Sequence, residues 1–304
     1  MAESTRVVYA AMAANFAIAV TKFAVAGVTG SSAMLSEGVH SLVDTGDSLL
    51  LLVGLKRSRK PPSAEHPFGH GKELFFWSLI VAVLIFGLGG GVSFYEGVVH
   101  LLDPHPIGDP FWNYVVLACA AVFESISFVI GLRAFRAERR GRPFWEALRT
   151  SKDPATYTVI AEDGAALAGL AIAAAGIWLS ERLQMPQLDG IASILIGVLL
   201  AGVAVLLIRE SRGLLVGEGI RPKTAREVRE LVLAEPGVRE MGPVLSMYVG
   251  PDDALVAMDV AFDHDTPAAE VAATIRRMEV EIRRRFPSVR RIYIEPVSGT
   301  QAAH

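Results

Sequence analysis

The chain has 304 residues, of which 52% are hydrophobic, and its mean hydropathy is +0.40. This composition is typical of a membrane protein that carries a soluble appendage, and it argues against a globular enzyme. The net charge of −3, with basic residues spread over several loops, excludes a nucleic-acid-binding surface, and the single cysteine, Cys119, excludes disulfides and cysteine-based metal sites.

Six apolar segments are long enough to cross a bilayer, which takes about 20 helical residues. The first segment is too long for the apolar region of a signal peptide and contains Asn15 and Lys22, so we expect a retained helix. The predicted spans are 7–28, 34–55, 74–101, 112–135, 156–180 and 189–208.

Basic residues are concentrated in alternate loops. The 56–72 loop contains five lysines and arginines and the 136–152 loop contains six, whereas the 102–111 loop contains none and the 181–188 loop has one. The positive-inside rule therefore predicts that both termini lie in the cytoplasm.

After Gly219 the composition becomes that of a small soluble domain. Helices are predicted to begin at Pro222 and after Thr266-Pro267, and the turn signal Gly-Pro-Asp-Asp separates two strands. The predicted strands are 244–249, 254–262 and 289–295, which gives the order α-β-β-α-β of a ferredoxin-like, two-layer α+β domain. We assign 1–212 to a six-helix membrane domain and 213–304 to this cytoplasmic domain, which is too small for an elaborate enzyme.

A histidine and two carboxylates share one face of the second predicted span. His40, Asp44 and Asp47 follow one another at i, i+4 and i+7, so a helix projects all three from one side. Ionisable groups at membrane depth are costly and usually face a bundle interior or a water-filled cavity. Imidazole and carboxylate are ligands of divalent metals such as zinc, so this face predicts a metal site.

The fifth predicted span carries two adjacent carboxylates, Glu162 and Asp163, which point about 100° apart on a helix. At most one of them can aim directly at an ion. Small neighbouring residues would let this helix approach the second span closely. His40, Asp44 and Asp163 would then give three ligands, with Glu162 or Asp47 as a fourth. The alternative is a buried polar network that holds the helices together.

Four further polar side chains lie at or near the membrane. His66 and His70, four residues apart in the loop after the second span, could bind a metal or protons, or form a solvated loop without an ion. Glu124 in the fourth span could carry protons, contact a ligand or pair with Lys22. Asn15 could donate a hydrogen bond to the site or form a contact between helices.

In the soluble domain a cluster of acidic residues with one histidine could bind metal, although such clusters at turns are usually solvated. Its members are Asp259, Asp263, His264, Asp265 and Glu295.

The six spans, the embedded HSLVD, the HPFGHGK loop and the trailing α+β domain together resemble the cation diffusion facilitator family of metal/proton antiporters, over nearly the whole chain. The resemblance implies a transport site built from a pair of ligands on the second helix and an HxxxD pair on the fifth. His40 and Asp44 match the first pair and Asp163 matches the final aspartate. Val159 stands where the histidine is expected, which makes Glu162 the natural substitute. This acidic doublet is similar to that of the divergent branch that includes a mitochondrial zinc transporter.

The resemblance also implies a second, interfacial metal site at His66 and His70, with Glu65 as a replacement for the aspartate that precedes them in the family. It further implies a homodimer that forms through the cytoplasmic domain. Gly242, Asp259 and Ala272 occupy positions near the expected ligands of that domain, so we expect its metal site to be weak or absent while dimerisation is kept.

We therefore expect proton-coupled export of a divalent transition metal, zinc in the first place, from the cytoplasm by alternating access. Zn²⁺ would be the transported substrate and H⁺ the counter-ion, with no cofactor. Protons would compete with the metal because ligands must be deprotonated to bind it. We expect a multi-pass protein of a bacterial inner membrane.

The alternatives are a metal sensor or scaffold that does not transport, and an antiporter of another cation or of an organic substrate. We do not expect an enzyme, because the sequence contains no recognisable pair of a nucleophile and a general base.

Overall fold

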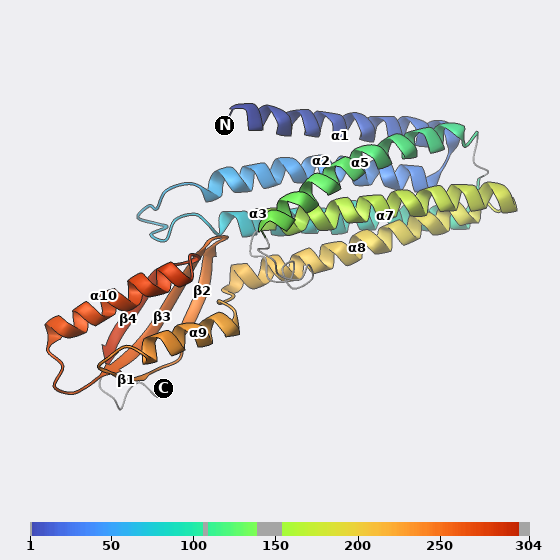
Figure 1. The fold of residues 1–304 in the computed structure, drawn as a ribbon. Helices are drawn as coiled ribbons and strands as arrows, with labels where there is room; N and C mark the ends of the chain where they lie inside the picture. Colours follow the sequence, from blue (N-terminus) through green and yellow to red (C-terminus); the bar gives the residue numbers. More distant parts are fainter. Residues whose placement is uncertain (1, 106–108, 139–153, 298–304) are drawn as a thin grey trace. The chain divides into compact units, whose positions relative to one another are not determined.

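The computed structural model describes residues 2–105, 109–138 and 154–297. All six predicted spans lie in helices (Figure 1). These are α1 (Ala2–Thr29), α2 (Ser32–Ser58), α5 (Phe111–Glu138), α7 (Pro154–Leu183), α8 (Gln187–Val216), and a third span made of α3 (Glu73–Leu84), η1 (Ile85–Gly90) and α4 (Gly91–Leu102).

Within the described residues, five of these spans are long and apolar enough to cross a membrane, and α1 adds the shorter apolar stretch Asn15–Thr29. Many large apolar side chains on these helices are exposed, among them Phe86, Phe123 and Leu206. Apolar side chains around the outside of a helical bundle suit a lipid environment. The structure thus agrees with a multi-pass membrane protein.

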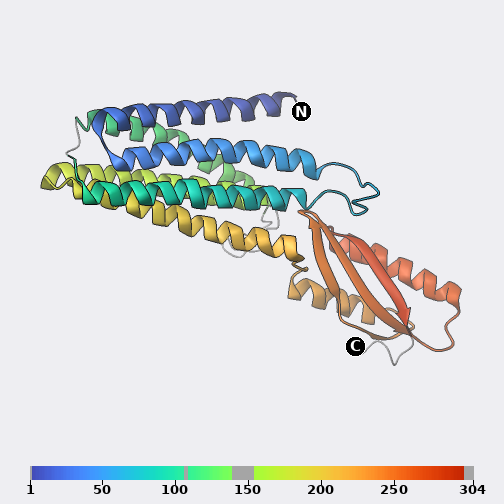
Figure 2. The same cartoon turned by 180° about the vertical axis from the view of Figure 1, so that it is seen from behind.

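Glycines bring the third span close to α8, and Figure 2 shows the two running side by side. A Cβ atom built on Gly97 of α4 would lie 2.7 Å from the Gly190 carbonyl oxygen, and one built on Gly190 of α8 would lie 2.9 Å from the Gly97 carbonyl oxygen. Because neither position has room for a side chain, the two backbones can touch.

The chain divides into two compact units. One contains the described residues up to Leu55 and from Phe76 to Ser211, and the other contains Lys56–Phe75 together with the described residues from Arg212 onward. The sequence did not predict that the segment after the second span would group with the C-terminal residues.

The soluble part of the second unit contains α9 (Pro222–Leu233), β1 (Val238–Met241), β2 (Leu245–Gly250), β3 (Asp253–Phe262), α10 (Ala268–Arg285) and β4 (Val289–Val297). Strand β3 pairs antiparallel with β1 and β2 along one edge and parallel with β4 along the other. The predicted order of helices and strands is found, except that β1 was missed. This strand has four residues and two charged side chains, so it lacks an apolar alternation long enough to recognise.

One face of the sheet forms the core of this domain. Alternate residues of β3, such as Val256 and Met258, are buried with Val228 of α9 and Met278 of α10. Both helices therefore cover the same sheet face. The opposite face carries Tyr293, which is 52% exposed.

The segment that follows α2 is fixed to this domain. The Arg291 guanidinium donates a hydrogen bond to the Phe68 carbonyl oxygen and lies over the Phe68 ring, 5.3 Å from its centroid. Gly71 packs against the backbone of Val249, where a side chain would not fit. Phe75 is fully buried in the core of the same unit. Residues 56–75 are therefore part of the soluble unit's structure.

Candidate metal centre

Helix α2 directs a stripe of ionisable side chains into the interior of the first compact unit, which contains the apolar helices. His40, Asp44 and Asp47 are 2%, 6% and 0% exposed, and Glu37, three residues before His40, is also fully buried. The His40 Nδ1 atom lies 3.2 Å from the Asp44 Oδ1 atom. The four positions repeat at intervals of three and four residues, which places them on one helix face.

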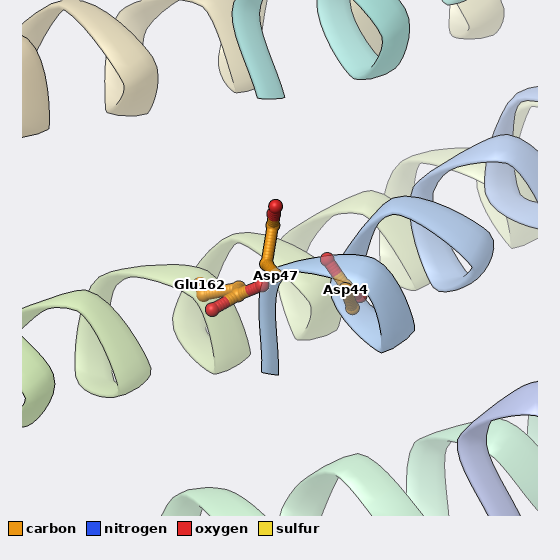
Figure 3. Close-up of side chains that lie close together, drawn as sticks. All are labelled: Asp44, Asp47 and Glu162. Carbon is orange, nitrogen blue, oxygen red and sulfur yellow. The ribbon is translucent and has the colours of Figure 1, made fainter. Parts of the chain in front are cut away.

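Glu162 of the neighbouring helix α7 lies close to Asp44 and Asp47 of this stripe (Figure 3). Asp44, Asp47 and Glu162 each offer a carboxylate oxygen, and these three atoms lie within 4.8 Å of one another. Among the described residues this is the one group of three or more histidine, cysteine or carboxylate side chains close enough to share an ion. Two helices far apart in sequence therefore supply the centre.

Several atoms at this centre have no hydrogen-bond partner. They are both carboxylate oxygens of Asp47, Oε1 of Glu162 and Nε2 of His40, while Asp44 Oδ1 and His40 Nδ1 have only their 3.2 Å contact with each other. Buried polar atoms are nearly always satisfied in folded proteins, so a group of unsatisfied acceptors calls for a cation or for protons. The arrangement can do either, because carboxylates and imidazole bind metals when deprotonated.

The acidic doublet of α7 is divided between two surroundings. Glu162 joins the carboxylates of α2, whereas Asp163 accepts a hydrogen bond from the Ser127 hydroxyl of α5, with 2.9 Å between the oxygens. Val159, one turn earlier, lies against Gly131 of α5. The doublet therefore sends one side chain to each side, as the angle of about 100° between neighbours requires.

The structure pairs Lys22 with Glu37, at 2.9 Å between Nζ and Oε2, and not with Glu124. Sequence reasoning gave Glu37 no role, although its spacing from His40 was a signal. Glu124 is buried in α5, where the charges of Lys22, Asp44 and Asp163 act on it. Asn15 is half-buried in α1.

The loop histidines lie together in the second unit. The ring centroids of His66 and His70 are 4.5 Å apart, and Gly69 adopts a φ of +83° in the turn between them, a conformation that favours glycine. His70 Nδ1 is 3.2 Å from the Pro61 carbonyl oxygen, and Glu65 is exposed. The rings are thus adjacent and accessible to solvent.

The acidic cluster of the soluble domain does not come together around its histidine. His264 Nε2 is 2.9 Å from the Arg239 guanidinium, a cationic neighbour that disfavours a metal at that nitrogen. Asp259 and Glu295 are partners in the β3–β4 register. Over the ranges that the structure describes, no three such side chains in this domain approach closely enough to hold an ion.

Comparisons with known proteins agree with this architecture. The model of the cation efflux transmembrane domain matches residues 8–216. The mitochondrial proton-coupled zinc antiporter SLC30A9 of Xenopus laevis is 35% identical over 237 residues, which cover 77% of this chain and 42% of that protein. This chain therefore spans less than half the length of that antiporter.

Two other relatives cover similar shares of the chain. Metal tolerance protein C4 of Arabidopsis thaliana is 33% identical over 262 residues, 86% of this chain and 57% of that protein. Magnetosome protein MamM of Paramagnetospirillum magneticum is 28% identical over 279 residues, 88% of this chain and 82% of that protein. None of these three names denotes an enzyme. Because the family model matches more than half of a chain with six apolar helices and a trailing α+β domain, the chain belongs to the cation diffusion facilitator family of cation efflux proteins.

Proposed function

We propose that the chain exports a divalent transition metal, zinc in the first place, from the cytoplasm in exchange for protons. The observation that carries the proposal is the group formed by Asp44, Asp47 and Glu162, in which both oxygens of Asp47 and Oε1 of Glu162 are buried without a hydrogen-bond partner. A charge-balancing cation accounts for three carboxylates at membrane depth better than a structural network, because a network would satisfy its own acceptors.

The donor set favours a borderline metal. Three carboxylates would suit Mg²⁺ or Mn²⁺, but the His40 imidazole next to Asp44 adds a nitrogen ligand, which suits Zn²⁺. The name of the SLC30A9 relatives, a proton-coupled zinc antiporter, supports the same substrate and counter-ion.

Proton exchange follows from the same atoms. Buried carboxylates that lose their metal must bind protons or another cation, because a bare charge is costly at this depth. Protons that arrive from the outer side would therefore release the metal and occupy Asp44, Asp47 and Glu162. A change in the packing of the helices would then return the protonated site to the cytoplasmic side.

The direction of export depends on how the chain is oriented in the membrane. Basic residues in the 56–72 and 136–152 loops predict that both termini are cytoplasmic. Residence in a bacterial inner membrane stays a prediction.

We also propose a homodimer that forms through the soluble domain. The sheet face that α9 and α10 leave uncovered carries Leu245, Met247 and Tyr293, which are 63%, 39% and 52% exposed. These residues lie side by side across β2, β3 and β4 by the strand register. An exposed apolar strip of this kind is typical of an interaction surface.

The decisive experiment is zinc uptake into proteoliposomes under an imposed pH gradient. Wild-type protein should move zinc with opposite movement of protons, and Asp44→Asn should abolish both. Asp103→Asn, a change at an exposed carboxylate, is the matched control and should transport normally. Zinc binding by the wild type without flux would favour a sensor, and proton movement that zinc does not affect would favour an antiporter of another substrate.

A further inference from the structure

A buried ion pair lies beside the proposed metal centre, on the same stripe of α2. Lys22 of α1 is 1% exposed and Glu37 is fully buried, and 2.9 Å separates Lys22 Nζ from Glu37 Oε2. Lys22 Nζ also donates a hydrogen bond to the Ser41 hydroxyl, at 2.8 Å. A lysine at this depth is costly to insert, so its presence calls for a function beyond packing.

The pair is electrostatically connected to the centre. Glu37 and Ser41 flank His40 along α2, so the ammonium group is held against the turn that carries the histidine. Of the charged groups that act on His40, Lys22 is positive, whereas Asp44 and Glu37 are negative. Lys22 also acts on Glu124 of α5. A cation that enters the centre meets a positive charge already in place.

The second oxygen of Glu37 faces α7, two turns along that helix from Glu162. Glu37 Oε1 is buried, has no hydrogen-bond partner and lies directly over Gly169 of α7. Gly169 is seven residues after Glu162 and therefore on the same face of α7. Glu37 therefore presents an unpartnered carboxylate oxygen between α2 and α7, about 10 Å along α7 from Glu162.

We propose that Lys22 is a tethered cation that neutralises the negative charge of Glu37 beside the centre, and so keeps the metal affinity of the centre low enough for release. The inference rests on the proposed transport function. A transport site must bind its ion firmly enough to load and weakly enough to unload. Lys22 and Glu37 impose charges of opposite sign on the centre. Removal of Lys22 should therefore raise the metal affinity, and removal of Glu37 should lower it.

The test is a cycle of variants of the full chain in detergent, with Zn²⁺ alone as the probe and the dissociation constant measured at pH 8 by competition with a fluorescent chelator. Lys22→Met should tighten zinc binding by about tenfold because the negative charge of Glu37 near the centre is no longer balanced. Glu37→Gln should weaken it by about tenfold because the ammonium charge is no longer balanced. The double variant should bind zinc as the wild type does.

Transport adds a second readout. In proteoliposomes Lys22→Met should lower both KM and the maximal rate of zinc uptake, because tighter binding slows release. Thr21→Val is the matched control, since it changes an exposed neighbour of Lys22 on α1 without changing any charge. Its dissociation constant should stay within about twofold of the wild type.

The two single variants separate a charge effect on zinc binding from a structural role of the ion pair. A pair that only holds helices together would weaken zinc binding in both single variants or leave it unchanged, and either result overturns the proposal. If neither single variant folds while the double variant folds and binds zinc normally, the pair is structural and the proposal is wrong. If the wild type does not bind zinc at all, the proposed function fails first.

Discussion

Arg291 of β4 binds Phe68, which lies 223 positions earlier in the loop that carries the two histidines. We call the contacts of Arg291 with Phe68 and Asp253 the clamp. The Arg291 Nη2 group donates to the Phe68 carbonyl oxygen at 3.0 Å, and Nε and Nη2 both bind Oδ2 of Asp253. The two hydrogen bonds to Asp253 orient the Arg291 guanidinium group, and the oriented guanidinium group holds the backbone of the loop at Phe68. His66 and His70 are therefore held by the soluble domain and not only by the helices that flank their loop.

Loss of this clamp should release the loop. Arg291→Met removes a charged hydrogen bond and a cation–π contact, a loss of about 1–3 kcal/mol. Hydrogen exchange of the 61–72 backbone in the full chain should become at least about tenfold faster. Arg290→Met, at an exposed neighbouring arginine, is the control, and equal exchange in both variants would contradict the clamp.

The two members of the acidic doublet should differ in their effect on metal binding. Glu162 lies in the group of unsatisfied carboxylates, whereas Asp163 is hydrogen-bonded to Ser127. Glu162→Gln should weaken zinc binding by more than about 100-fold, and Asp163→Asn by about 10–100-fold, as is typical of a residue outside the ligand set. Calorimetric titration of both variants measures this, and the reverse order would assign Asp163 as the ligand.

A carboxylate on α8 should stabilise the start of α2. Asp189 is fully buried and accepts hydrogen bonds from the Ser31 hydroxyl at 2.7 Å and from the Ser32 backbone N–H at 2.6 Å. Asp189→Asn should reduce stability by about 1–3 kcal/mol because the free N–H groups at the start of the helix lose a charged acceptor.

Thermal unfolding in detergent tests this prediction for Asp189. Asp109 makes a comparable but exposed contact with the Phe111 N–H at the start of α5. Asp109→Asn should therefore lower the midpoint much less. Equal losses in the two variants would show that burial of the carboxylate adds nothing.

Alkaline pH should destabilise the soluble domain through Tyr248 of β2. Burial of its ring raises the pKa of the Tyr248 hydroxyl above its ordinary value of 10.0. The unfolded chain then loses this proton at a lower pH than the folded chain does, so the stabilisation is complete below pH 10.0 and is lost as pH rises through the folded-state pKa.

The matching experiment compares urea unfolding of the full chain in detergent at neutral pH and above pH 10.0. Tyr248→Phe, which has no group to ionise, should lose less stability between the two conditions than the wild type. The same loss in both proteins would show that other groups control the alkaline response.

Much of the architecture could be predicted from the sequence, because the signals are local. Apolar segments of sufficient length specified the six spans, and the alternation from Ala254 to Phe262 specified the central strand. The face shared by His40, Asp44 and Asp47 follows from helical spacing alone. Strand β1 was missed because four residues with two charges carry too little pattern.

The tertiary structure decided which side chains meet. Helical spacing states that Glu162 and Asp163 point apart, but only the packing of α7 between α2 and α5 assigns Glu162 to the carboxylates and Asp163 to Ser127. Likewise the partner of Lys22 depends on how α1 lies against α2: the sequence suggested Glu124, and the structure shows Glu37. Spacing along one helix fixes directions within that helix, whereas contacts between helices depend on their relative rotation, which no local pattern records.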